Sequence, residues 1–146
     1  MSERRVVVTG LGAITPVGNN VAATWASLLA GKSGVSRITQ FDPTALECHI
    51  AAEIKGFEPT QVLPLKESRR MERFTQFAVC ASHMLMEQAN WKIPAEEAER
   101  AGVIIGVGLG GLEGIETQHQ KLLSSGVGRI SPFLVFPHLW HRTPGP

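Results

Sequence analysis

The 146 residues include no tyrosine and only two cysteines, and aromatic residues make up 6% of the chain. No stretch approaches the roughly 18 uninterrupted apolar residues of a membrane-spanning helix, so an integral membrane protein is not expected. An excess of charge is missing as well, because 14 basic residues face 13 acidic ones and the net charge is +1. Such a chain has no global field to draw it to nucleic acid or to an anionic membrane, and any basic binding site must be local.

What is present is the composition of one folded domain, with 43% hydrophobic and 18% charged residues. The fifteen glycines predict tight turns and close backbone approaches, a common trait of α/β enzymes. The first residues, Met-Ser-Glu-Arg-Arg, precede an apolar run of only Val6 to Val8, which does not fit a secretory signal. We therefore expect a cytoplasmic chain in which Cys48 and Cys80 stay reduced.

Strand and helix patterns alternate along the sequence. Two β-branched runs that lead into glycine, Arg5–Gly10 and Ala101–Ile105, predict buried strands, and residues 48–54 predict a marginal one. Apolar residues at three- and four-residue steps predict helices over 21–30, about 68–90 and 112–123, with a short helix after Pro94 and a further start at Ser131-Pro132. Asn19 or Asn20 is expected to cap the first helix, and Gly31 to end it. This alternation predicts an α/β fold with helices on the faces of a sheet.

Two glycine-rich turns follow the predicted strands, but neither has the dinucleotide spacing G-x-G-x-x-G. Gly10, Gly12 and Gly18 miss the third position, and Pro16 interrupts the start of the helix that would face a pyrophosphate. The run Gly106–Gly111 also departs from the pattern. Close packing of strand, loop and helix is the favoured interpretation, and nucleotide binding stays as a minor alternative.

The sequence offers no convincing catalytic or metal-binding group. Cys80 lies within the long predicted helix, where a buried small hydrophobic side chain is expected, and Cys48 has His49 on the opposite face of a strand. Glu116 and His119 share a helix face, but one such pair does not make a di-iron site. We therefore assign no catalytic residue, no metal ligand and no cofactor.

Four basic residues, Lys66, Arg69, Arg70 and Arg73, gather around the start of the long predicted helix. Cations at a helix N-terminus oppose the helix dipole, which favours an anionic partner slightly over a merely solvated surface. Composition alone leaves both interpretations open.

Several segments together carry a family resemblance. They are Val6-Val-Val-Thr-Gly-Leu-Gly-x-x-x-Pro-Val-Gly18, Trp25-x-x-Leu-Leu-Ala-Gly-Lys-Ser-Gly34, Phe41-Asp, Arg70-Met-x-x-Phe74 and Gly106-x-Gly-Leu-Gly-Gly111. In order and spacing, residues 4 to 133 resemble the β-ketoacyl-acyl carrier protein synthases, above all the type II elongating enzyme of fatty acid synthesis. The resemblance implies a thiolase-like fold, layered α-β-α-β-α, of which this chain holds the first part of the N-terminal half, and a homodimer in the intact family.

The resemblance also implies roles for individual residues. The family's nucleophilic cysteine and two catalytic histidines lie downstream of the matched region, so the chain alone is expected to be inactive. By position, Lys66, Arg69, Arg70 and Arg129 resemble the basic patch that binds acyl carrier protein. Leu109 matches a residue bordering the acyl-chain pocket, and Phe133 one that reaches this pocket across the dimer interface.

The sequence after Phe133 departs from the family pattern. We expect residues 1–133 to form a partial N-terminal β-ketoacyl synthase domain, and 134–146, with three prolines and no helical period, to be a non-family tail that is out of frame or misassembled. Two functions follow as hypotheses: a truncated 3-oxoacyl-acyl carrier protein synthase, or a non-catalytic module that binds acyl carrier protein.

Overall fold

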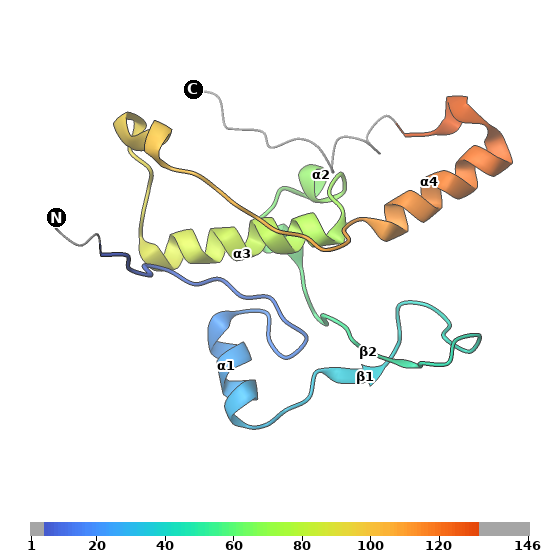
Figure 1. The fold of residues 1–146 in the computed structure, drawn as a ribbon, viewed down its shortest axis with the longest axis horizontal. Helices are drawn as coiled ribbons and strands as arrows, with labels where there is room; N and C mark the ends of the chain where they lie inside the picture. The colour runs from blue at the N-terminus through green and yellow to red at the C-terminus, as the bar shows by residue number, and fades with distance from the viewer. Residues whose placement is uncertain (1–4, 132–146) are drawn as a thin grey trace. The chain divides into compact units, whose positions relative to one another are not determined.

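The computed structural model describes residues 5–131, so Pro132, Phe133 and the predicted tail lie outside the described residues. These residues form two compact units, the first made of residues 5–58 with Cys80–Ala98 and the second of Pro59–Val79 with 99–131. The elements, labelled in part in Figure 1, are α1 (Val21–Leu29), β1 (Val35–Arg37), β2 (Ile50–Ala52), η1 (Pro59–Gln61), α2 (Leu65–Ser68), α3 (Arg73–Ala89), η2 (Ala95–Arg100), α4 (Leu112–Ser125) and η3 (Val127–Arg129). Over this range, none of the helices combines the length and apolar character that crossing a membrane requires.

Helix α1 forms as the sequence predicts. The Asn20 side chain accepts a hydrogen bond from the Ala23 amide at 2.7 Å, which satisfies one of the unpaired donors of the first turn. Gly31, just past the end of the helix, has φ +64°, a conformation that glycine adopts without steric cost. Helix α4 likewise confirms the helix predicted over 112–123 and extends it to Ser125.

A tight turn precedes α1 and is tied to it. The backbones of Thr15 and Gly18 exchange two hydrogen bonds, at 2.8 and 3.1 Å. Hydroxyl groups of α1 donate to the same turn: Thr24 to the Gly18 carbonyl at 3.1 Å and Ser27 to the Val17 carbonyl at 2.8 Å. The glycine-rich turn and the first helix therefore form one hydrogen-bonded assembly.

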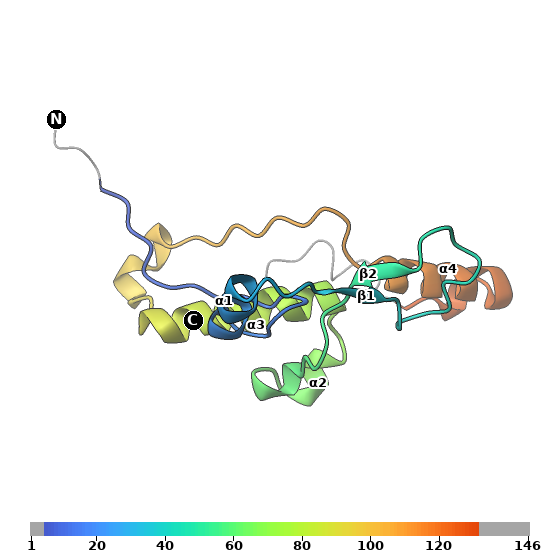
Figure 2. The same cartoon turned by 90° about the horizontal axis from the view of Figure 1, so that it is seen from below.

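The first unit also contains a two-stranded antiparallel ribbon (Figure 2), in which Ser36 lies opposite Ala51. Strand β2 confirms a strand within residues 48–54, although it is shorter than predicted, and the sequence did not indicate β1. Beyond β2, the Glu53 carboxylate accepts hydrogen bonds from the Thr39 hydroxyl at 2.7 Å and from the amides of Thr39 and Gln40. These bonds hold the loop that follows β1 against the residue that follows β2.

The long helix predicted from about Ser68 is interrupted, which corrects the prediction. The chain forms the single turn α2, then a bend, and α3 begins only at Arg73. The side-chain amide of Gln76 donates to the Ser68 carbonyl at 2.9 Å and to the Met71 carbonyl at 3.2 Å. Because these side-chain bonds satisfy carbonyl groups at the bend, the break in the helix does not leave them unpaired.

The two predicted buried strands, Arg5–Gly10 and Ala101–Ile105, are wrong for the described residues. Both segments are extended, but neither pairs with another strand in the part of the chain that the structure describes. Val6 is 92% exposed and Ile104 is 100% exposed. A strand requires a partner for its amide and carbonyl groups, and neither segment finds one within its own unit.

The glycines after the first run serve close packing against a helix. Gly12 lies against α3, where an added Cβ atom would be only 2.7 Å from the Ala81 carbonyl carbon. The neighbouring Leu11 amide donates to the Gln88 side-chain oxygen at 2.6 Å. The start of the turn thus packs on the side of α3, as the close-packing interpretation predicts.

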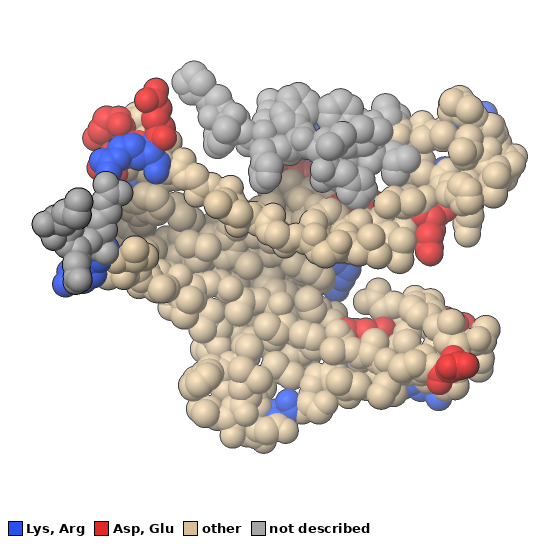
Figure 3. Space-filling view, viewed as in Figure 1, with Lys and Arg blue, Asp and Glu red and all other residues tan. Residues whose placement is uncertain are grey.

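Few side chains are fully covered in either unit. Leu63, Ser68 and Cys80 are buried, while many large apolar side chains, among them Val8, Trp25 and Leu123, are exposed. In Figure 3 the described surface in view is mostly uncharged, with Lys, Arg, Asp and Glu atoms in scattered places. Both units therefore expose apolar surface that a soluble monomer normally covers.

Candidate functional site

The predicted basic patch is built on the bend between α2 and α3. Lys66 lies on α2, Arg69 ends it and Arg70 follows, and all three side chains are exposed. The backbone amides of Arg69 and Arg70 donate to the carbonyls of Leu65 and Glu67, at 3.1 and 2.9 Å. Arg129 lies on η3, after the C-terminal end of α4, and so on a different element from the other three. The structure thus groups three of the four predicted residues.

Gln76 fixes the bend that carries the two arginines. Its Nε2 atom reaches the carbonyl of Ser68, one residue before Arg69, and the carbonyl of Met71, one residue after Arg70. The same atom lies 3.4 Å from the Ser68 hydroxyl, and Ser68 is buried. This role was not predictable from the sequence, because a glutamine at one position of a helix gives no signal of the bend that it contacts.

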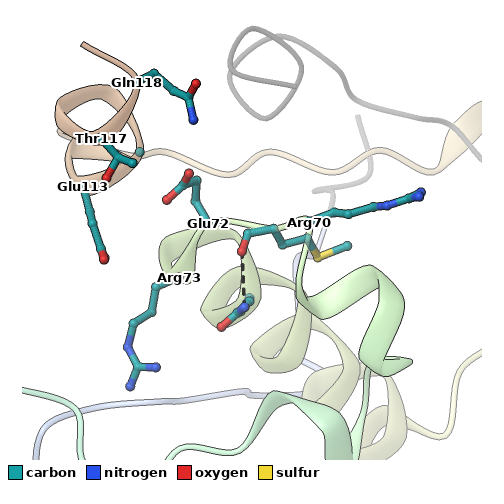
Figure 4. Close-up of a pocket in the computed structure, with 9 residues that line it drawn as sticks. Arg70, Glu72, Arg73, Glu113, Thr117 and Gln118 are labelled. Atoms are coloured by element: carbon teal, nitrogen blue, oxygen red, sulfur yellow. Dashed lines mark hydrogen bonds between the residues drawn. The ribbon is translucent and has the colours of Figure 1, made fainter. Parts of the chain in front are cut away.

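A shallow cavity of about 410 Å³ adjoins the patch, between the bend and the first turns of α4 (Figure 4). Its lining includes Arg70, Glu72 and Gly114. The Glu72 carboxyl group packs against Gly114, where an added Cβ atom would be 2.9 Å from the carboxyl carbon. A carboxylate at the first turn of a helix is favourable because the helix dipole is positive there.

Arg70 extends away from this carboxylate. In Figure 4 its guanidinium group and the Glu72 carboxylate point in opposite directions. The negative charge of Glu72 therefore lies against α4, and the positive charge of Arg70 lies away from it. No pattern in the sequence indicates that Glu72 contacts α4.

The predicted acyl-chain contacts are only partly within the described residues. Leu109 lies in the glycine-rich loop before α4 and is 77% exposed. The neighbouring Gly110 packs against the first turn of α3, because an added Cβ atom there would be 2.9 Å from the Phe74 ring. Phe133 lies outside the described residues, so its contact with an acyl chain stays a prediction, as does that of Leu109.

Neither thiol has the surroundings of a nucleophile. Cys80 is 1% exposed in the middle of α3, and its burial raises the pKa of the thiol. Cys48 is exposed, with Sγ 3.5 Å from the Ile50 carbonyl oxygen, and the neighbouring His49 ring bonds through Nε2 to the Leu46 carbonyl at 2.8 Å. The prediction that Cys80 is a buried small side chain is confirmed.

The carboxylates and imidazoles do not form a metal centre in the described range. Glu116 and His119 are both exposed on α4, as the solvated-surface interpretation predicts. Between residues 5 and 131, no three His, Cys, Asp or Glu side chains come together as metal ligands would.

Comparison with known sequences gives one consistent family. Residues 3–136 match the family described as Beta-ketoacyl synthase, N-terminal domain. A 3-oxoacyl-[acyl-carrier-protein] synthase 2 of Synechocystis sp. is 45% identical over 135 residues, which are 92% of this chain and 32% of that protein. The synthase of the same name from Vibrio cholerae is also 45% identical, with 33% of its length covered. The chain therefore spans about a third of the length of the curated relatives it matches.

Solved structures give the same fold. The ishigamide ketosynthase/chain length factor has a TM-score of 0.73 at 31% identity, and a β-ketoacyl synthase from Burkholderia phymatum has 0.73 at 28%. Each match covers 92% of this chain and 34% of the other. A type II polyketide ketosynthase in complex with its acyl-carrier protein, at 21% identity and a TM-score of 0.69, supports the fold alone.

These matches confirm the expected α/β, thiolase-like fold, of which the present chain is a part. The comparisons agree with the ordered motifs of the sequence, and the structural matches extend over nearly the whole chain. The chain belongs to the β-ketoacyl synthase family, and its residues 3–136 match the N-terminal domain of that family.

Proposed function

We propose that the chain is the N-terminal part of an elongating 3-oxoacyl-acyl carrier protein synthase and that it has no condensing activity by itself. The two curated relatives described above, each 45% identical, support the class of enzyme. The observation that carries the proposal is the state of the two thiols, Cys48 and Cys80, which are the only cysteines in the chain.

Acyl transfer to a cysteine requires a thiolate at a position that the substrate can reach. Cys80 is buried, and the same burial raises the pKa of its thiol, so the reactive form is disfavoured and inaccessible. Cys48 is accessible, but the imidazole beside it is bonded to a backbone carbonyl. Neither site can supply the activated nucleophile of the condensation.

The test is an assay of carbon dioxide release from malonyl-acyl carrier protein, with the full-length Synechocystis relative as the positive control. The purified chain is expected to release none above the rate without enzyme. Acyl-carrier substrate is then added, and the protein is analysed by mass spectrometry for a thioester. Carbon dioxide release, or a thioester on Cys48 or Cys80, would contradict the proposal.

A second candidate function is binding of acyl carrier protein without catalysis. It is favoured by the grouping of Lys66, Arg69 and Arg70 on one exposed bend, because exposed cations steer an acidic partner. Arg129 belongs to this proposal as a separate contact on η3.

Binding is tested by titrating the chain with acyl carrier protein. Arg69→Ala combined with Arg70→Ala is expected to weaken binding about tenfold, and the difference should shrink as salt is added. The control combines Arg100→Ala with Lys121→Ala, which changes the net charge equally at exposed positions outside the patch. Equal weakening by both pairs would mean that total charge, and not the patch, attracts the carrier.

The remaining parts of the proposal concern the whole enzyme. Leu109 and Phe133 would contact the acyl chain, and the complete protein would be a homodimer. Cytoplasmic location is proposed as well, supported by two free thiols, one of which, Cys48, is exposed.

A further inference from the structure

Arg69 and Arg70 stand between two carbonyl groups that share one hydrogen-bond donor. The Gln76 Nε2 atom, in the first turn of α3, lies 2.9 Å from the Ser68 carbonyl oxygen and 3.2 Å from that of Met71. Ser68 directly precedes the two arginines, and Met71 directly follows them. One uncharged side chain therefore holds the backbone on both sides of the pair.

The backbone bonds of the two arginines do not make this link. The Arg69 amide donates to the Leu65 carbonyl at 3.1 Å. The Arg70 amide donates to the Glu67 carbonyl at 2.9 Å. Both acceptors lie on α2, so these bonds tie each arginine to the helical turn before it. Of these bonds, only the two from Gln76 join the bend to α3, and they set how the arginines are placed relative to that helix.

The linkage is shielded from water at one end. Ser68 is 5% exposed, although the neighbouring Arg69 and Arg70 are exposed. Water competes poorly for a buried carbonyl, so a donor supplied by the protein is worth more there than on the surface. The Gln76 amide therefore restrains the bend from its buried side and leaves both arginine side chains at the surface.

This restraint matters for an anionic partner that must contact both arginines at once. Binding such a partner immobilises two long side chains, and each of them loses conformational entropy. A loose bend would add the cost of ordering the backbone between them, whereas a bend that is already held does not. We propose that Gln76 is a positioning residue for the binding of acyl carrier protein, because it keeps Arg69 and Arg70 where both can contact acidic groups of the carrier. This role presupposes the carrier binding proposed above.

A positioning role predicts a specific kinetic effect. Gln76→Leu removes the donor but keeps every charge, so electrostatic steering is retained and the association rate constant should stay within about twofold of the wild-type value. The dissociation rate constant should rise about three- to fivefold, because one of the two arginine contacts would more often be lost. Partial unfolding would act differently. It would lower the amount of carrier bound at saturation and leave the dissociation rate constant unchanged.

The test is surface plasmon resonance with the 146-residue chain immobilised and purified acyl carrier protein of Synechocystis as the analyte. Gln76→Leu is compared with the matched control Gln120→Leu, at an exposed position of α4, which should bind as the wild type does. Gln76→Leu is then combined with Arg69→Ala and Arg70→Ala. In that background it should no longer raise the dissociation rate constant, since the contacts that it positions are gone.

Circular dichroism checks the fold of each variant. If Gln76→Leu loses the helical signal, Gln76→Met takes its place, because methionine keeps the unbranched length of glutamine and also lacks the donor.

The results separate the role of Gln76 from carrier binding itself. Absence of saturable binding, or binding that Arg69→Ala with Arg70→Ala leaves unchanged, would overturn both proposals. If the double arginine variant binds more weakly but Gln76→Leu dissociates at the wild-type rate, the positioning role alone is overturned. An equal effect of Gln76→Leu with and without the arginines would overturn it too. So would unfolding of both Gln76 variants, because Gln76 would then support the fold as a whole.

Discussion

The side-chain Nε2 atom of Gln76 lies 2.9 Å from the carbonyl oxygen of Ser68, and this bond joins the first turn of α3 to the end of α2. Between these elements stand Arg69 and Arg70, the centre of the basic patch. The geometry of the basic patch thus depends on Gln76, an uncharged residue outside the patch.

Replacing Gln76 with leucine should loosen this bend. The variant removes the donor for the Ser68 and Met71 carbonyls, and we expect a loss of about 1 kcal/mol in local stability. Hydrogen exchange at the amides of residues 69–72 should accelerate, while exchange in the rest of α3 stays unchanged. Gln120→Leu, on the exposed face of α4, is the control. Equal exchange in both variants would show that the bend does not depend on the Gln76 amide.

Gly12 should not tolerate a methyl group. Because its Cβ position is 2.7 Å from the carbonyl carbon of Ala81, Gly12→Ala forces the turn away from α3 and should destabilise the first unit by about 1–3 kcal/mol. Gly108 has open space around its Cβ position, and Gly108→Ala should change stability by less than about 0.5 kcal/mol. Urea unfolding followed by circular dichroism measures both. A neutral Gly12→Ala would rule out the close contact with α3.

Acid should open the loop that Glu53 closes. Hydrogen bonds from the Thr39 hydroxyl and then from the Thr39 amide lower the pKa of Glu53 below its ordinary value. A lowered folded-state pKa means that the stabilisation is present above the unfolded-state pKa and is lost as pH falls through the folded-state value. The amide resonances of Thr39 and Gln40 should therefore shift between about pH 6 and pH 2.

Glu53→Gln separates this effect from general acid unfolding. The variant should show the altered Thr39 and Gln40 resonances already at neutral pH, whereas Glu47→Gln, a change of the same kind in the same loop, should retain the native ones. Native resonances in Glu53→Gln would mean that the carboxylate charge is not needed.

The two thiols should differ in reactivity. Cys48 is exposed, while Cys80 is buried and the pKa of its thiol is raised, so iodoacetamide should modify Cys48 first. Modification of Cys80 is expected to be at least about tenfold slower in the folded chain and to become comparable in urea. Mass spectrometry of Cys48→Ser gives the rate for Cys80 alone. Equal rates without denaturant would show that α3 does not protect the thiol.

Local signals explain which parts of the fold were predictable. The Asn20 cap, Gly31 and the apolar spacing of α4 each act within a few residues, and the corresponding helices form where the sequence indicates. The prediction of strands at Arg5–Gly10 and Ala101–Ile105 was wrong because strand formation depends on a pairing partner, which composition does not reveal. The break before α3 was missed because it depends on a side chain eight residues from the carbonyl that it contacts.

The candidate site was predictable in composition but not in arrangement. The resemblance supplied Lys66, Arg69, Arg70 and Arg129 as one group, and the structure gathers only the first three on a single bend. Glu72 and Gln76, which contact α4 and the bend, carry no sequence pattern of their own. Their roles depend on contacts between elements, and these become visible only in three dimensions.

The paired hydrogen bonds between Thr15 and Gly18 leave room for two residues between them. Because the Thr24 and Ser27 hydroxyl groups of α1 donate to the Gly18 and Val17 carbonyls of this turn, an inserted or deleted residue in it would displace the helix as well. Length variation among members of the family should therefore avoid the stretch from Thr15 to Asn20.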